Sequence, residues 1–311
     1  MLGQKRSVGV DEHGPVALRK YLGQAMRDQV RAIREGHRAV LEGADPEAVH
    51  DLRVALRRLR VWGRMLPRDN GSDGLGPTAE QEHEIGWLWD RLGAVRDLEV
   101  QQALVEGLIA RKKKIGRAAA EAVMLALARR HRSHKLGLRS TLRSVRVRGL
   151  VEGLAGRFDA PAEPMKGKEL KAAAEEAVPA VRRRLRRARR LGDSITDGSP
   201  PEELHRLRLK AKRLRYAAEV VEDLRPGRLG GLVKAAASLQ DLLGQQHDWS
   251  VVAGYLGEAK RRARDASDET AAAAVGRLAE AAVAEADRCR ARFPARYRRL
   301  IRTGRRSLGR G

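Results

Sequence analysis

Apolar side chains recur at three- and four-residue spacing along most of the chain, which is the pattern of one face of an α-helix. Glycine- and proline-rich stretches interrupt that pattern, so each uninterrupted stretch predicts a separate helix. The stretches are 15–41, 45–66, 78–113, 115–132 with a broken continuation to 158, 168–191, 200–225, 230–264 and 269–292. The pattern predicts no β-strand. The chain is therefore predicted to be all-α, with four long helices in each half that form two four-helix bundles.

Proline, glycine and charge divide this helical pattern into segments. Pro161 and Pro164 lie in the stretch that we interpret as the linker between the two halves. The predicted segments are a flexible lead at 1–14, a first bundle half at 15–160, the linker at 161–168, a second bundle half at 169–300 and a basic tail at 301–311.

Two predicted helices carry nearly the same basic sequence: HDLRVALRRLR begins at His50, and HRLRLKAKRLR begins at His205. At about 100° per residue the cations of each helix form one stripe, opposite a face of leucine and alanine. The cations are not interleaved with acids at i+4 spacing, so they repel one another, and an anionic ligand would relieve that repulsion. The alternative is a solvated face that binds nothing. The candidate residues are His50, Arg53, Arg57, Arg60 and Arg64 in the first copy and His205, Arg208, Lys212, Arg213 and Arg215 in the second.

A second signature is also repeated. DRLGAVRD begins at Asp90 and matches DLLGQQHD, which begins at Asp241. Each copy has a glycine within a predicted helix, Gly93 and Gly244, and because glycine is unfavourable there, its repetition predicts close helix packing. The final acids of the two copies are expected to orient the stripe cations or to cap a turn: Asp97 and Asp248.

Together these segments resemble the CHAD family, the conserved histidine α-helical domain. The resemblance lies in HxxRxxxRRxR from His50, LGxxRD from Leu92, HxxRxxxKRxRY from His205 and LQDxLGxxxD from Leu239, and it covers about residues 15–300. It implies two four-helix bundles related by a pseudo-two-fold axis, with a basic channel between them that binds inorganic polyphosphate. The ligand groups that it implies are His50, Arg53, Arg57, Arg60, His205, Arg208, Lys212 and Arg215.

The second stripe departs from the first at one position. Glu219 occupies the place that Arg64 has in the first copy, so the second stripe is one cation shorter. We expect this glutamate to steer a neighbouring arginine.

The overall charge extends the basic character beyond the stripes. The chain has 64 Lys and Arg against 40 Asp and Glu, a net charge of +24 and a pI near 11.1, which attracts nucleic acid, anionic lipid and phosphate polymers. Cys289 is the only cysteine, so neither an internal disulfide nor a cysteine-based metal site is expected. No apolar run approaches about 18 residues, and the N-terminus has no signal-like apolar core. We expect a cytoplasmic protein without membrane insertion, associated with polyphosphate granules.

Three functions compete for the stripes. Inorganic polyphosphate fits best, because its phosphates accept charge-assisted hydrogen bonds from guanidinium groups and carry no base to be recognised. A nucleic-acid binder would make the same phosphate contacts but would normally add aromatic platforms for the bases. Aromatic residues are 3% of the chain, and Trp62, Trp87 and Trp89 are expected in the core rather than among the cations. We therefore expect at most weak, non-specific nucleic-acid binding.

The third candidate is a histidine phosphoacceptor at His50 or His205. No paired acid or magnesium-binding cluster lies near either histidine in the sequence, so we disfavour it. Cations around both histidines would also repel a divalent metal ion. We predict a polyphosphate-binding protein that is not an enzyme and has no cofactor, catalytic residue or metal.

Overall fold

The computed structural model describes residues 16–42, 48–65, 76–111, 117–158 and 164–309. In this part of the chain every regular element is an α-helix, which confirms the predicted fold class. The helices are α1 (Val16–Glu42), α2 (Ala48–Gly63), α3 (Ala79–Arg111), α4 (Arg117–Arg143), α5 (Val145–Phe158), α6 (Gly167–Asp193), α7 (Pro201–Leu224), α8 (Gly230–Asp265) and α9 (Glu269–Leu308).

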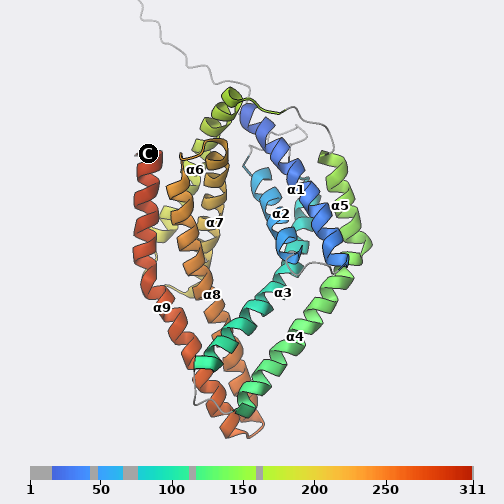
Figure 1. Ribbon diagram of the computed structural model, residues 1–311. Coiled ribbons are helices and arrows are strands. Elements are labelled where there is room, and N and C mark those ends of the chain that lie inside the picture. The colour runs from blue at the N-terminus through green and yellow to red at the C-terminus, as the bar shows by residue number, and fades with distance from the viewer. Residues whose placement is uncertain (1–15, 43–47, 66–75, 112–116, 159–163, 310–311) are drawn as a thin grey trace, which may run out of the picture.

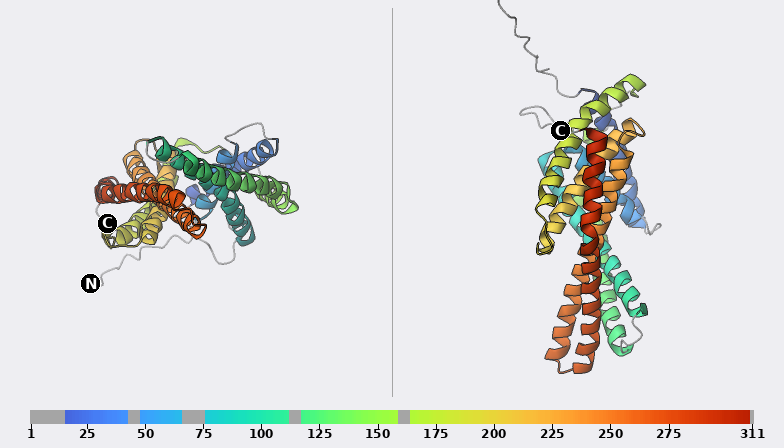
Figure 2. Two further views of the ribbon diagram at one scale, coloured as in Figure 1. Left: turned by 90° about the horizontal axis from the view of Figure 1, so that it is seen from below. Right: turned by 90° about the vertical axis from the view of Figure 1, so that its left-hand side faces the viewer.

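The helices form two groups that lie side by side (Figure 1). One group contains α1, α2 and α5, and the other contains α6 to α9. Helix α1 packs on α6 at one end, and α2 contacts α7 between the groups. Helix α3 runs from the first group to the far ends of α8 and α9, and α4 returns from there. The α3–α4 and α8–α9 pairs therefore project in the same direction (Figure 2).

The apolar faces of the two basic helices are buried, as their periodicity predicts. The buried side chains are Leu52, Ala55, Leu56, Leu59 and Trp62 in α2, and Leu204, Leu207, Ala211, Leu214, Ala217 and Val221 in α7. Each leucine contributes about 1.5–3 kcal/mol by its burial, so neither helix can rotate about its axis without a large loss. This burial fixes the direction in which the two basic stripes point.

The predicted helix of 115–158 is two helices that meet at Ser144. The Ser144 hydroxyl donates to the main-chain oxygen of Thr141 at 2.6 Å and accepts from the amide of Val147 at 3.3 Å. A serine that bonds its own backbone in this way competes with the helical hydrogen bonds. The first half of the described chain therefore has five helices rather than the predicted four, and the broken continuation to residue 158 is confirmed as α5.

The prediction that the last helix ends near Arg292 and that 301–311 form a tail was wrong, because α9 continues to Leu308. Pro294 lies inside this helix, and an interior proline costs about 3 kcal/mol. The buried residues that follow keep the helical spacing and offset that cost by packing: Tyr297, Leu300 and Leu308.

The other predicted segment boundaries are only partly visible. The flexible lead at 1–14 lies outside the described residues, as do residues 161–163 of the linker. Helix α6 begins at Gly167, within the predicted linker. The division into two bundle halves stays a prediction.

Candidate functional site

A cavity of about 460 Å³ lies where α2, α3, α7 and α8 meet. Six of the residues singled out in the sequence line it: Arg53, Asp97, His205, Arg208, Lys212 and Asp248. It is also lined by Trp89, Asp90, Gly93 and His247. The fold therefore brings members of both repeated signatures and both stripes to one place, although they are far apart in the sequence.

The cations of α2 and α7 share aromatic partners. The Arg53 guanidinium carbon lies 4.6 Å from the ring centroid of Trp89, and the Lys212 nitrogen lies 5.2 Å from the same centroid. The Arg57 guanidinium carbon lies 4.9 Å from the ring of Tyr216, which belongs to α7. The prediction that no aromatic residue interleaves with the stripes was wrong. Trp89 packs against the core on one side and is half-exposed, so it also reaches the cations.

Burial and mutual repulsion destabilise the charges of these cations. Burial is the largest cause that lowers the pKa of Arg53 and Arg57, and the charge of Arg215 further lowers that of Arg57. Burial, followed by the charges of Arg57 and Arg208, lowers the pKa of Lys212 to about 8. Because Arg57 is on α2 and Lys212 on α7, the two stripes repel each other across one cleft.

Several buried nitrogen atoms of the stripes, three from guanidinium groups and one from an imidazole, have no hydrogen-bond partner in the described part of the chain. These atoms are Arg53 Nη1, Arg57 Nε, Arg60 Nε and His205 Nδ1. A buried polar group without a partner costs about 1–3 kcal/mol, and more when it is charged. The unpaired nitrogens and the depressed pKa values indicate that the acids of the cleft do not fully compensate these cations.

Two stripe cations have acidic partners, and the expectation that no acid lies at i+4 spacing in the stripes was wrong for one of them, Arg215. Arg215 Nε donates to Glu219 at 2.7 Å, which confirms that this glutamate steers a neighbouring arginine. Arg64 Nη2 donates to Glu82 of α3 at 3.1 Å. These two pairs are partly exposed and reduce the positive charge at the ends of the stripes.

The repeated glycines make room for stripe arginines rather than for a neighbouring helix. A Cβ atom added to Gly93 would lie 3.2 Å from Arg53 Nη1, with nothing else within 4 Å. A Cβ atom added to Gly244 would lie 3.5 Å from Arg208 Nε, and its other close neighbours are also atoms of Arg208. Each glycine of the repeated signature therefore leaves space for the side chain of one stripe arginine. The prediction of close helix packing at these positions was wrong.

The two predicted supporting acids lie near the same two arginines. The charge of Asp97 raises the pKa of Arg53, which partly offsets its burial. Burial raises the pKa of Asp248, and the charge of Arg208 opposes this. Each acid therefore acts on the arginine of one stripe, although their supporting role stays a prediction.

His205 has an aromatic partner that the sequence analysis did not select. The ring centroid of His247 lies 4.7 Å from that of His205. Burial is the main cause that lowers the pKa of both imidazoles, and the charge of His247 further lowers that of His205. The repeat contained a signal for this residue, because His247 aligns with Arg96 in the second signature.

The other predicted residues lie outside the cavity. His50 is exposed at the start of α2, and it does not line the cavity. Arg57, Arg60 and Arg215 continue the stripes beyond it. Arg64 and Arg213 line a second cavity of about 370 Å³.

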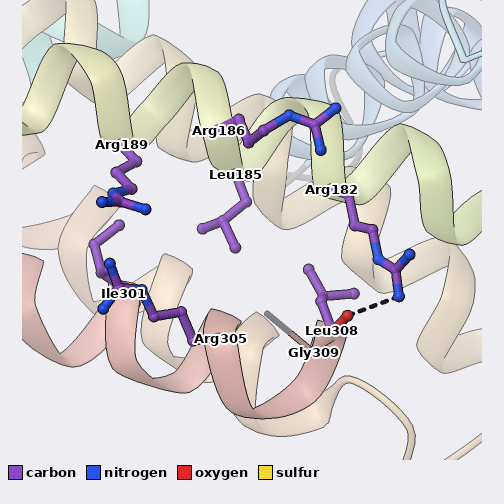
Figure 3. Close-up of a pocket in the computed structure, with 8 residues that line it drawn as sticks. All are labelled: Arg182, Leu185, Arg186, Arg189, Ile301, Arg305, Leu308 and Gly309. Carbon is purple, nitrogen blue, oxygen red and sulfur yellow. Dashed lines mark hydrogen bonds between the residues drawn. The ribbon is translucent and has the colours of Figure 1, made fainter. Parts of the chain in front are cut away.

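Helix α6 contributes arginines that the sequence analysis did not select, and they lie on two edges of the helix. One edge lines the second cavity with Arg183, Arg184 and Arg187. The other edge lines a third cavity of about 350 Å³ between α6 and α9, with Arg182, Arg186 and Arg189 (Figure 3). There Arg182 Nη2 donates to the main-chain oxygen of Leu308 at 2.7 Å.

The described residues contain no group of three or more His, Cys, Asp or Glu side chains that could hold a metal ion. Among the described helices, none is long and apolar enough to cross a membrane.

The fold and the cleft define a class of protein: a chain whose described elements are all helices, two of which are related in sequence, basic and in contact with each other. The chain belongs to the CHAD domain family, whose sequence model matches residues 24–257. It is 30% identical over 302 residues to Uncharacterized protein Rv2226 of Mycobacterium tuberculosis (strain ATCC 25618 / H37Rv), and the match covers 94% of this chain and 56% of that protein. Uncharacterized protein MT2285 of strain CDC 1551 / Oshkosh matches to the same extent. The chain thus spans about half the length of the curated relatives it matches.

Two solved structures share the fold. The crystal structure of the CHAD domain from the plant Ricinus communis has a TM-score of 0.66 and 24% identity, and the match covers 96% of this chain and 94% of that chain. PptA from Streptomyces chartreusis also has a TM-score of 0.66, with 19% identity and coverage of 92% and 99%. At these identities the likeness concerns the fold alone.

Proposed function

We propose that this protein binds inorganic polyphosphate in a basic channel between α2 and α7. The observation that carries the proposal is the set of buried guanidinium nitrogens of α2 that have no hydrogen-bond partner in the described part of the chain and that lie beside the cations of α7. A polyanion would supply the missing acceptors along its whole length. The contacts would be charge-assisted hydrogen bonds from guanidinium groups to phosphate oxygens.

A pseudo-two-fold relation between the halves is part of this proposal. Arg53 lies against Gly93 in the first half, as Arg208 lies against Gly244 in the second. Each pair joins one stripe to one glycine signature in the same manner. A repeating polymer suits such a site, because successive phosphates are chemically identical and can meet equivalent cations. The role that the family resemblance implies for these residues agrees with this arrangement.

Nucleic acid is the second candidate, and Trp89 is the observation that favours it, because a half-exposed ring in a basic cleft can stack on a base. However, two cations, Arg53 and Lys212, already lie on that ring. We therefore propose that nucleic acid binds weakly and without sequence preference. The bound polymer is not cleaved in this proposal, and association with cytoplasmic polyphosphate granules would follow from binding alone.

Calorimetry with the purified chain tests the proposal. We expect tight binding of long-chain polyphosphate, much weaker binding of orthophosphate and no release of orthophosphate. A polymer spans both rows of cations, so the second row acts at high effective concentration, whereas a single phosphate cannot span them. Single-stranded DNA should compete poorly at matched salt. Equal affinity for orthophosphate and for the long polymer, or displacement of the polymer by DNA at equal phosphate concentration, would contradict the proposal.

A further inference from the structure

We infer that the polyphosphate path continues beyond the cleft onto α6, where a second cluster of cations makes the protein prefer long chains to short ones. This inference rests on the proposed function. We call this cluster the α6 station. It consists of Arg183, Arg184 and Arg187 of α6 with Lys210 and Arg213 of α7.

The α6 station has a stronger local excess of positive charge than the cleft. Asp90, Asp97 and Asp248 line the cleft cavity and partly balance its cations. The second cavity, in contrast, is lined by Met65 and six cationic residues, with no acid among its lining residues. A concave surface of one charge sign raises the local concentration of an oppositely charged ligand.

The excess of positive charge at the α6 station includes a cation, Arg184, that is partly buried and fixed by hydrogen bonds. Burial, followed by the charges of Arg183, Arg187 and Arg213, lowers its pKa to about 10. Its Nη2 donates to the main-chain oxygen of Arg64 at 3.2 Å, and its Nη1 donates to the main-chain oxygen of Ala180 at 3.3 Å. Arg184 therefore fixes α6 against the end of α2, and the neighbouring arginines are held beside the first stripe.

A row of cations leads from the cleft to the α6 station. The buried Arg60 Nε has no hydrogen-bond partner among the described residues. Burial, followed by the charges of Arg64 and Arg213, lowers the pKa of Arg60. Arg60 therefore lies within electrostatic reach of a cation of the first stripe and of a cation of the α6 station. Arg53 and Arg64 are separated by about 16 Å along α2 at 1.5 Å per residue. A short oligophosphate held at Arg53 cannot also reach Arg183 and Arg187, whereas a long polymer can.

The two arginines to replace are Arg183 and Arg187, because both are exposed and line the second cavity. In the Arg183→Ala/Arg187→Ala variant, we expect the Kd for long-chain polyphosphate to rise about tenfold or more, because an intramolecular second contact is lost. The dependence of log Kd on log salt concentration should fall by about two, one for each lost phosphate contact. The Kd for tripolyphosphate should stay within about twofold of the wild type if a short chain binds at the unpartnered guanidinium nitrogens of Arg53 and Arg57 in the cleft, as we propose.

Helix α6 itself provides the matched control. Arg186→Ala/Arg189→Ala removes the same charge from the same helix, but on the edge that faces α9 (Figure 3). It should leave both affinities unchanged, and thermal unfolding should show that both variants fold. Equal weakening of long-chain binding by both variants would contradict the proposal that long chains contact the α6 station. Arg183→Ala/Arg187→Ala would also contradict it if it weakened tripolyphosphate binding as much as long-chain binding. A wild-type chain that binds neither polymer would instead overturn the proposed function itself.

Discussion

Replacing Lys212 with methionine is expected to stabilise the fold and, at the same time, to weaken polyphosphate binding. Methionine has nearly the same length as lysine and can pack on Trp89 without a charge. In the wild type, burial and the neighbouring arginines lower the pKa of the Lys212 ammonium from 10.5 to about 8. Its charge is therefore unfavourable in the free protein and becomes favourable only when an anion is bound.

The magnitude follows from this pKa. A lysine whose pKa falls from 10.5 to about 8 carries at most about 3 kcal/mol of unfavourable interaction in the folded state. Solvent screening of a half-buried group reduces this to about 1–2 kcal/mol. Between pH 8 and 10.5 the unfolded chain binds more protons than the folded one, so wild-type stability rises with pH. The advantage of the methionine variant should be complete below pH 8 and should disappear as the pH approaches 10.5.

Urea unfolding of both proteins at about pH 7 and pH 10 measures this difference. Lys234→Met is the matched control, because Lys234 is exposed on α8, so its replacement should change the free energy of unfolding by less than about 0.5 kcal/mol. Calorimetry should show weaker polyphosphate binding for Lys212→Met only. If Lys212→Met were less stable than the wild type at pH 7, Lys212 would not be an uncompensated cation, and the reasoning would be refuted.

Two further predictions concern the glycine signature and the histidines. Gly93→Ala places a methyl group 3.2 Å from Arg53 Nη1, so it should displace that guanidinium and weaken polyphosphate binding, while stability holds or rises by about 1 kcal/mol. Gly107→Ala, in the same helix with nothing within 4 Å of the added carbon, should leave binding unchanged, and equal losses in calorimetry would contradict this. Burial lowers the pKa of His205 in the free protein, whereas a bound phosphate would raise it, so affinity should increase as pH falls from about 8 to 5.5. His205→Gln should flatten this profile and His50→Gln should not; a profile unaffected by His205→Gln would exclude the histidine as its source.

The sequence was sufficient to predict the all-helical fold class and the buried faces of the two basic helices, but not the break at Ser144 or the end of the last helix. Helical periodicity marks a buried face directly, and the leucines on the predicted apolar faces of α2 and α7 are buried, whereas Leu209, which lies off that face, is exposed. The same periodicity could have extended the last helix, since Tyr297 and Leu300 continue its apolar face. Pro294 concealed that continuation, because the cost of an interior proline is local whereas the packing that offsets it is tertiary.

The composition of the site depended more strongly on tertiary arrangement. Trp89 has an apolar ring and packs partly on the core, and no local signal indicates that its other side meets cations from two helices. Arg183 and Arg186 are equally basic in sequence, yet they line different cavities on two edges of α6. His247 is the exception, because its alignment with Arg96 could have identified it.

The central claim is that the stripes of α2 and α7 form one site, and paired charge reversals test it most directly. Arg53→Glu/Arg57→Glu changes the first stripe, and Arg208→Glu/Lys212→Glu changes the second. Calorimetry with long-chain polyphosphate gives the affinity and the stoichiometry of each variant. One shared site predicts that either double variant loses most of the affinity of the wild type. Half the stoichiometry with unchanged affinity, in either variant, would contradict the account.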